Sequence, residues 1–256
     1  MRQTKSPINK PLLRNAGESV DRELDDHFDT HLLMPIMAIA FSLVLIGLEW
    51  WRHFNPMPTS PWVLTVVGGL VIFTSGFWIW FALKKARQLR LGRDGERAVG
   101  QFLERFRPDG FQIYHDVVTG DANIDHVLIG PNGVYTVETK TLSKPARGQA
   151  KIVANAAGVT VNGLMLHRNP IIQAKAQANW LKNYFGEAGF KVSVQPVVVF
   201  PGWFVEPADF GSLGAWVLEP KALPSFIEIA NNAVAPETAK ALSLCLSNYI
   251  RSQSNI

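Results

Sequence analysis

Cysteine is almost absent from this sequence of 256 residues, which contains only Cys245. A single thiol cannot form an intramolecular disulfide, and it cannot build a zinc site from several cysteines. Charged residues are also sparse, at 18% of the chain, and they are missing altogether from Leu32 to Leu48 and from Pro61 to Leu83. No helix-turn-helix, zinc-finger or aromatic RNA-binding motif is evident in the sequence. Nothing in the chain therefore predicts recognition of a particular base sequence.

The two uncharged runs predict a transmembrane helical hairpin at residues 32–83, with spans at about 32–51 and 61–83. Each run is long enough to cross a hydrocarbon core of about 30 Å, and tryptophans lie near the ends, as is typical of a membrane interface. Two buried helices of a soluble core are the alternative, which requires two nearly uncharged stretches in succession. Residues 1–31 are polar and predict a mostly disordered tail with a short helix at 19–28.

Basic residues after the second run determine the expected orientation. They are Lys84, Lys85, Arg87, Arg90 and Arg93. Positive charge beside a span favours the cytoplasmic side. We therefore expect a multi-pass protein of the plasma or inner membrane, with a basic linker at 84–93 and a domain at 94–256 facing the cytoplasm, as do both termini. Because membrane topology explains this basic run, the net charge of +4 is weak evidence for binding nucleic acid.

Residues 123–140 predict a β-hairpin around which the domain is organised. Two runs rich in Val, Ile, Leu and Tyr flank the turn Gly130-Pro131-Asn132-Gly133. That turn places Ile129 opposite Val134. The register of the whole hairpin follows from this pair, because side chains alternate between the two faces of a strand.

Two carboxylates and one lysine meet in that register. Asp125 falls opposite Glu138, and the period of two places Lys140 on the same face as Glu138. Opposed carboxylates destabilise a sheet unless their charge is neutralised. A hard divalent cation would neutralise them, and Lys140 would be close enough to hold or deprotonate a metal-bound water. A surface charge ladder in which Lys140 pairs with Glu138 is the alternative.

Two further polar side chains are expected on helices that face the sheet. The helix predicted at 92–107 has Asp94 as its N-cap and carries Glu96 on its inward stripe. Stabilisation of the first helical turn is the alternative role for Glu96. Gln173 opens the helix predicted at 171–187 and also points toward the sheet. Its alternative role is that of a capping or satisfied core amide.

The remaining elements complete an α/β pattern with a mixed central sheet flanked by helices. A strand at 192–200, preceded by a helix, is expected to be central and parallel to a neighbour. The other expected elements are strands at 111–118 and 215–218, a small hairpin at 151–154 and 159–162, and helices at 221–230 and 236–251.

The order of these motifs resembles that of a known family. Gly95-Glu96, Asp125, Glu138-Thr139-Lys140 and Asn169-Pro170-Ile171-Ile172-Gln173 follow one another as in the nuclease-related domain (NERD), which belongs to the PD-(D/E)XK phosphodiesterase superfamily. The resemblance covers roughly residues 92–199. It implies a restriction-endonuclease-like core in the order α-β-β-β-α-β.

The resemblance also implies an activity, the metal-dependent hydrolysis of phosphodiester bonds in nucleic acid, with DNA favoured over RNA. The side chains implied as catalytic are Glu96, Asp125, Glu138, Lys140 and Gln173. Mg²⁺ or Mn²⁺ would be held by Asp125, Glu138 and a backbone carbonyl at Thr139, and Lys140 would position or activate water.

In the same resemblance Glu96 would support the metal or the base, and Gln173 would orient the scissile phosphate, the metal water or Lys140. Two other classes of function remain open. The domain could bind nucleic acid or a protein at the lipid bilayer without cutting anything, or the function could reside in the membrane hairpin alone. The same fold can host unrelated functions, so the fold does not choose among them.

Overall fold

The computed structural model describes residues 13–55, 60–120, 123–144, 151–206, 210–230 and 232–253. The chain divides into two compact units. The helical unit is Ser19–Leu91, and the α/β unit combines Met1–Glu18 with Gly92–Ile256. The part of the expected tail before residue 13 lies outside the described residues.

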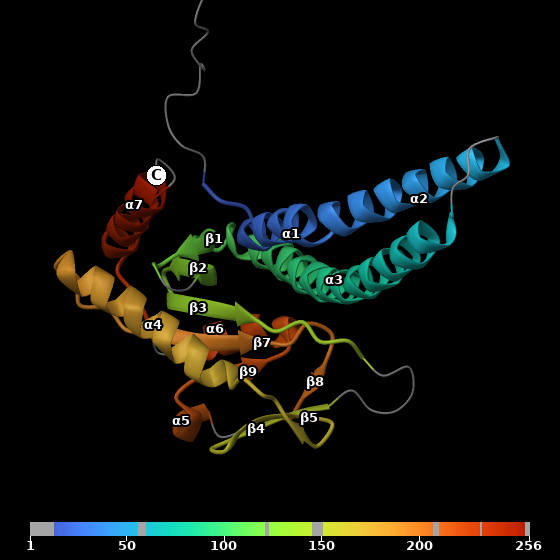
Figure 1. Cartoon of the computed structure of the whole chain (residues 1–256). Helices are drawn as coiled ribbons and strands as arrows, with labels where there is room; N and C mark the ends of the chain where they lie inside the picture. The colour runs from blue at the N-terminus through green and yellow to red at the C-terminus, as the bar shows by residue number, and fades with distance from the viewer. Residues whose placement is uncertain are drawn as a thin grey trace, which may run out of the picture. The chain divides into compact units, whose positions relative to one another are not determined.

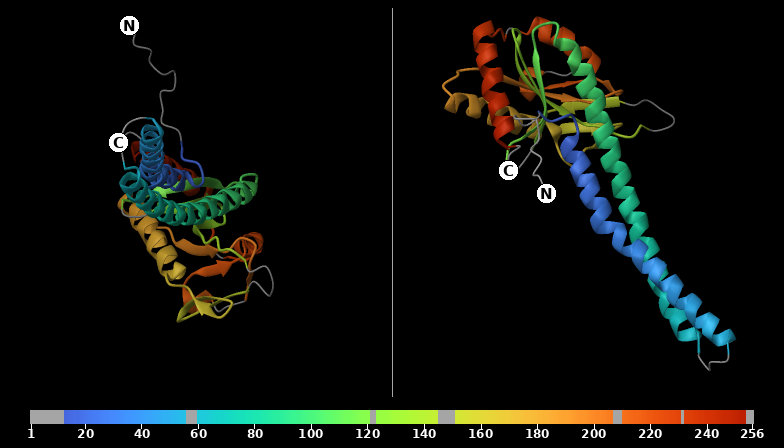
Figure 2. Two further views of the ribbon diagram at one scale, coloured as in Figure 1. Left: turned by 45° about the vertical axis from the view of Figure 1, so that its right-hand side comes forward. Right: turned by 90° about the horizontal axis from the view of Figure 1, so that it is seen from above.

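The helical unit is built from three helices, which can be followed in Figure 2. They are α1 (Glu18–His31), α2 (Leu33–Phe54) and α3 (Trp62–Leu103), the last of which continues into the α/β unit. α2 and the first half of α3 lie side by side because small residues allow close approach. A Cβ on Gly68 would lie 2.7 Å from Ile46 Cδ1. Near the far end, Trp50 Nε1 donates to Thr65 Oγ1 at 3.0 Å.

Most large apolar side chains of the helical unit face outward. Phe73 is 74% exposed and Trp78 is 66% exposed. Two helical stretches, Glu18–Phe54 and Trp62–Phe106, are long and apolar enough to cross a membrane. In their most apolar parts only 11% and 17% of the residues are buried. The core helix of a soluble protein would be mostly buried, whereas these two stretches leave most of their apolar residues exposed.

The helices are longer than the sequence patterns predicted. α1 extends beyond the short helix expected at 19–28. The residues expected as a linker at 84–93 are part of α3, so the N-cap assigned to Asp94 was wrong, because the helix does not begin there. This region consists largely of Lys, Arg and Leu, which are strong helix formers. No proline interrupts it, so the helix continues through Gly92.

The α/β unit contains a five-stranded mixed sheet (Figure 1). Its strands are β1 (Gln112–Val118), β2 (Asn123–Gly130), β3 (Gly133–Thr139), β7 (Val194–Val199) and β9 (Trp216–Leu218), in the order β1-β2-β3-β7-β9. β1, β2 and β3 are antiparallel, and β3, β7 and β9 are parallel. Ile129 pairs with Val134, so the predicted hairpin register is correct. The predicted mixed α/β fold class is confirmed.

Helices cover both faces of this sheet. The helical elements of the unit are η1 (Glu104–Phe106), α4 (Pro170–Glu187), α5 (Phe210–Leu213), η2 (Pro220–Ala222), α6 (Leu223–Ile229) and α7 (Pro236–Gln253). The end of α3 and α6 bury apolar residues on one face, including Leu103 and Ile227. α4 and α7 bury theirs on the other, including Leu181 and Leu246. The order α3, β1, β2, β3, α4, β7 matches the core layout expected from the sequence.

A smaller sheet is formed by three strands that lie between β3 and α4 in the chain and by one that follows β7. The predicted hairpin forms β4 (Lys151–Asn155) and β5 (Gly158–Val161), and β6 (Leu164–Met165) and β8 (Phe204–Val205) extend it in the order β6-β5-β4-β8. Its inner face, including Ile152 and Val159, packs against Val198 and Trp203. The small sheet therefore shares a core with the end of β7.

The regular alternation of side chains along β1 and β2 is interrupted at an acidic residue in each strand. Tyr114 and Val117 both pack in the cluster with α4 and α7, although an odd number of positions separates them. The same holds for Ile124 and Val127 on β2. Asp116, in the interrupted part of β1, has a positive φ of 50°. Such local irregularities re-aim side chains and are frequent next to functional sites.

Candidate functional site

Glu138 is the centre of a hydrogen-bonded set of polar side chains at the end of β3. It is 2% exposed, and it cannot remain ionised there without partners. Lys140 Nζ donates to its Oε1 at 2.5 Å, and Gln177 Nε2 donates to its Oε2 at 2.5 Å. Both carboxylate oxygens therefore have a donor, one of them cationic.

Lys140 connects this carboxylate to the start of α4. Its Nζ also donates to Gln173 Oε1 at 3.0 Å. Gln173 is placed there by the local sequence, because Asn169 caps α4 by accepting from Ile171 N at 3.0 Å and Pro170 occupies the first turn. An ammonium group has three donors, and two of them are occupied by these contacts.

Asp125 lies against the same end of β3. The register His126 opposite Val137 places Asp125 across from Glu138 when it is continued by one residue. Thr139 N–H donates to Asp125 Oδ2 at 2.7 Å. Burial raises the pKa of Asp125 well above its usual value, and the charges of Glu138 and Glu96 raise it further. The Thr139 hydrogen bond and Lys140 act in the opposite direction.

Glu96 joins the cluster from α3. Burial raises its pKa from 4.5 to about 7, the charges of Asp116 and Glu138 add to the increase, and Lys140 opposes it. Glu96 lies deep inside a helix that begins at Trp62, so the alternative of stabilising a first helical turn does not apply. The structure thus brings Glu96, Asp125 and Glu138 into one electrostatic cluster.

Gly95 explains how α3 approaches this end of the sheet. A Cβ at this position would lie 1.6 Å from Thr141 Oγ1 and 2.7 Å from Thr141 Cβ. Any other residue at position 95 would have a Cβ that overlaps the Thr141 side chain, so the close contact requires glycine. Since Thr141 directly follows Lys140, this contact fixes the lysine end of β3 against the turn of α3 that carries Glu96.

Two polar residues of the site were not assigned to it from the sequence. Gln177 is 4% exposed, and its Nε2 also donates to Asn123 O at 2.8 Å. Its position one turn after Gln173 was a usable signal, because both lie on the same face of α4. Asp116 gave no comparable signal. His115 pairs with His126 and Val117 pairs with Ile124. Asp116 lies between the first residues of these two pairs and Asp125 between the second, so the two carboxylates lie across from each other.

The histidines form a separate chain of contacts. His115 Nδ1 lies 2.8 Å from His126 Nδ1, and His115 Nε2 lies 3.2 Å from Glu104 Oε1. Burial lowers the pKa of both rings, that of His126 well below its usual value, so the neutral forms are favoured. His167 is exposed. These contacts hold the two rings to each other and to Glu104.

The donor set at the cluster suits a hard cation bound by few protein ligands. The described part of the chain contains no group of three or more His, Cys, Asp or Glu residues that could hold a metal ion. Asp125 and Glu138 offer two carboxylates from neighbouring strands, and small divalent cations often use one or two carboxylates and keep several waters. Buried Thr139 Oγ1 and Gln177 Oε1 have no hydrogen-bond partner among the described residues. A cation would also relieve the mutual repulsion of the acidic side chains.

A mixed sheet of this order, with acidic side chains and a lysine at the end of its third strand, defines a nuclease-like domain. Residues 91–201 match the family model of the nuclease-related domain, NERD, so the chain carries such a domain over those residues. The resemblance expected over roughly 92–199 is confirmed. The match covers less than half of the chain and leaves out α1, α2 and the C-terminal helices.

Comparison with individual proteins adds little. No curated protein matches the chain significantly. Among solved structures, the crystal structure of protein VC1899 from Vibrio cholerae matches with 11% sequence identity and a TM-score of 0.32, over 90% of this chain and 58% of that chain. The chain thus spans 58% of the length of that protein.

Proposed function

We propose that this protein is a membrane-anchored nuclease that hydrolyses phosphodiester bonds of nucleic acid, with DNA favoured, and depends on Mg²⁺ or Mn²⁺. The observation that carries the proposal is the contact of Lys140 with both Glu138 and Gln173, beside the carboxylates of Asp125 and Glu96. A charge ladder on an exposed surface would not bury Glu138 to 2% exposure.

Each side chain has a role in this proposal. Asp125 and Glu138 would hold the cation, with the backbone of Thr139 beside them. When bound, the cation would supply Lewis-acid activation of water and stabilise charge on the phosphate. Lys140 would position the attacking water, and Gln173 would orient Lys140 and the scissile phosphate.

Glu96 fits a role in proton transfer. Its pKa of about 7 means that it exchanges a proton near neutral pH, where a general acid or base is most effective. Lys140 lowers this pKa and Glu138 raises it, so the protonation state of Glu96 depends on the charges of its neighbours in the cluster. A cation at Asp125 and Glu138 would favour ionised Glu96.

The anchor follows from the helical unit. We assign the membrane spans to α2 and to the apolar first half of α3. The outward-facing apolar side chains and the tryptophans near the ends support this assignment. The basic residues at 84–93 would hold the α/β unit on the cytoplasmic side, where nucleic acid and magnesium are present.

Cleavage by the full-length protein in detergent tests the proposal. Truncation at Gly92 would cut through α3, so the intact chain is the better reagent. We expect Mg²⁺-dependent or Mn²⁺-dependent cutting of supercoiled, duplex or single-stranded DNA or of RNA. EDTA should abolish it, and Glu138→Gln and Lys140→Met should each lower it by at least about 100-fold.

Asp94→Asn is the matched control, because Asp94 is exposed on the same helix as Glu96 and bonds only its neighbour Arg93 in the described contacts. It should cut at the normal rate. Metal-independent binding of nucleic acid without cutting, unchanged by Lys140→Met, would instead identify a binding module. Equal cutting by Glu138→Gln and the normal protein would refute the assigned site.

A further inference from the structure

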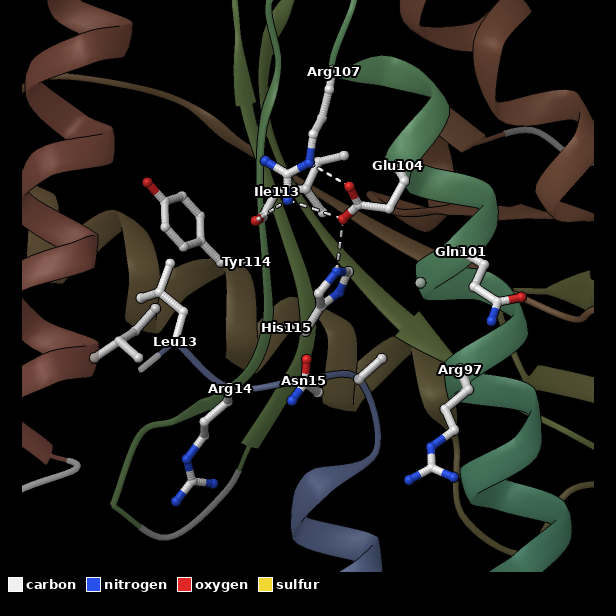
Figure 3. A pocket seen from close by; sticks show the side chains of 13 residues that line it. Leu13, Arg14, Asn15, Arg97, Gln101, Glu104, Arg107, Ile113, Tyr114 and His115 are labelled. Atoms are coloured by element: carbon white, nitrogen blue, oxygen red, sulfur yellow. Dashed lines mark hydrogen bonds and ion pairs between the residues drawn. The ribbon is translucent and has the colours of Figure 1, made fainter. Parts of the chain in front are cut away.

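A cavity of about 590 Å³ lies against β1, the edge strand of the large sheet, and the proposed cleavage site does not use it. Its lining includes arginines from three parts of the chain, which are labelled in Figure 3. Arg14 comes from the segment before α1, Arg97 from α3, and Arg107 from the residue after η1. The other polar residues that line it are Asn15, Gln101, Glu104, Tyr114 and His115.

One wall of the cavity is fixed by close packing. A Cβ on Gly100 would lie 2.8 Å from Ala16 Cβ and 3.4 Å from His115 Cε1. Segment 13–16 can therefore lie against α3 only because residue 100 is glycine. Arg14 is further held by its ion pair with Asp116 at 2.9 Å. The positions of Arg14 and Asn15 in the wall are thus set by the fold.

The charge of the lining is predominantly positive. Glu104 is the one acidic side chain among the described residues that line the cavity, and it pairs with Arg107. Asp116 is 2% exposed and neutralises Arg14 from behind the wall. Arg97 is exposed, and so are large parts of the Arg107 and Glu104 side chains. The described lining thus contains three guanidinium groups and one carboxylate.

We propose that this cavity binds a phosphate monoester, carried either by a free nucleotide or by the end of a nucleic acid. One guanidinium group can bind two phosphate oxygens at once, so several arginines in one cavity favour a phosphate ligand. The amides of Asn15 and Gln101 add neutral hydrogen-bonding groups. Leu13, Ile113 and Tyr114 form an apolar side for the nucleoside, and the volume lies within the range of roughly 300–1,000 Å³ typical of small-molecule sites.

This site is distinct from the carboxylate cluster but adjoins it. Arg97 follows Glu96 directly in α3, and Arg14 pairs with the Asp116 carboxylate that also acts on Glu96. The inference goes beyond the proposed cleavage reaction, and it holds even for a domain that binds nucleic acid without cutting it.

The test measures binding to the full-length protein in detergent and EDTA, so that a divalent cation does not contribute. The probes are a fluorescent oligonucleotide with a 5′-phosphate, the same oligonucleotide without it, and AMP and inorganic phosphate as competitors. We expect the phosphorylated end, AMP or both to bind at least about tenfold more tightly than the unphosphorylated oligonucleotide. Arg97→Gln and Arg107→Gln should each remove this preference.

Arg105→Gln is the matched control, because Arg105 lies over the Phe102 ring and does not line the cavity. It should keep the preference, and so should Glu138→Gln, which separates this site from the cleavage site. A preference for the phosphorylated oligonucleotide would assign nucleic-acid ends, and tight binding of AMP alone would assign free nucleotides. Equal binding of the two oligonucleotides without saturable AMP binding would overturn the proposal. So would a preference that survives Arg97→Gln.

Discussion

Glu138 keeps its place at the end of β3 through two donors, Lys140 and Gln177. Gln177→Leu preserves the approximate volume of the side chain but leaves Glu138 Oε2 and Asn123 O without their donor. We expect the free energy of unfolding to fall by about 1–3 kcal/mol, because buried acceptors would lose their partner. Cleavage should fall as well, since Glu138 would no longer be oriented.

Denaturant unfolding checks the stability of Gln177→Leu. Asn179→Leu is the control, because Asn179 is exposed on the same helix and an exposed substitution usually changes stability by less than about 0.5 kcal/mol. Equal stability of the two variants would show that Gln177 does not support Glu138.

Glu96 should make the metal-free protein less stable as the pH rises. Its folded pKa of about 7 lies above the usual 4.5, so between these values the folded state binds more protons than the unfolded state. Stability contributed by the protonated side chain is present below pH 4.5 and is lost as the pH rises through 7. Glu96→Gln should therefore stabilise the protein in EDTA at pH 8 by about 1–3 kcal/mol.

The same substitution should lower cleavage, because glutamine cannot exchange a proton. Unfolding in EDTA at pH 5 and pH 8 checks the stability effect, with Asp94→Asn as the control. A stabilisation by Glu96→Gln that is equal at both pH values would contradict the assigned pKa. Gains in stability at the cost of activity are typical of substitutions at functional sites.

At the scale of elements, those with strong local patterns were predictable. The hairpin β2–β3 follows from alternating apolar residues around a glycine-bearing turn, and α4 follows from the cap at Asn169. The uninterrupted α3 was missed because Asp94 suits a cap as well as an exposed helical position. β6 and β8 have two residues each, and only tertiary pairing creates them.

The carboxylate cluster was predictable only in part for a similar reason. The spacing of Asp125, Glu138 and Lys140 follows from strand geometry, which is local. The approach of Glu96 depends on how α3 packs, and Asp116 depends on an interruption of β1 that has no counterpart in the hydrophobic pattern. The order of the NERD motifs assigned Glu96 to the site, whereas no sequence pattern predicted a role for Asp116.

The contact between α3 and the end of β3 can be tested through Gly95. Alanine would favour the helix by about 1 kcal/mol, but its Cβ would overlap Thr141 and cost about 1–3 kcal/mol or more. We expect Gly95→Ala to be destabilised overall and to cut poorly, because Thr141 and the adjoining Lys140 must shift.

Gly92→Ala is the matched control, because it lies in the same helix and a Cβ there would meet nothing within 4 Å. It should gain about 0.5–1 kcal/mol and keep its activity. Thermal unfolding of both variants provides the measurement. A Gly95→Ala protein as stable as Gly92→Ala would mean that Thr141 yields easily and does not fix Lys140.

At the scale of the whole molecule, the helical unit has the dimensions of a membrane anchor. α2 contains 22 residues. At 1.5 Å per residue it is about 33 Å long, close to the thickness of a hydrocarbon core. The protein should therefore fractionate with membranes and remain there in high salt and alkaline carbonate. Release by either treatment would indicate attachment through a surface contact instead.

Cysteine labelling tests the orientation, because Cys245 is the only native thiol and Cys245→Ala gives a clean background. Asn55, at the end of α2, is exposed, and so is Glu187 at the end of α4. With the α/β unit in the cytoplasm, Asn55→Cys should react with a membrane-impermeant maleimide in intact cells, and Glu187→Cys only after permeabilisation. The reverse pattern would place the α/β unit outside, away from cytoplasmic nucleic acid, and would remove the physical basis for a nuclease acting there.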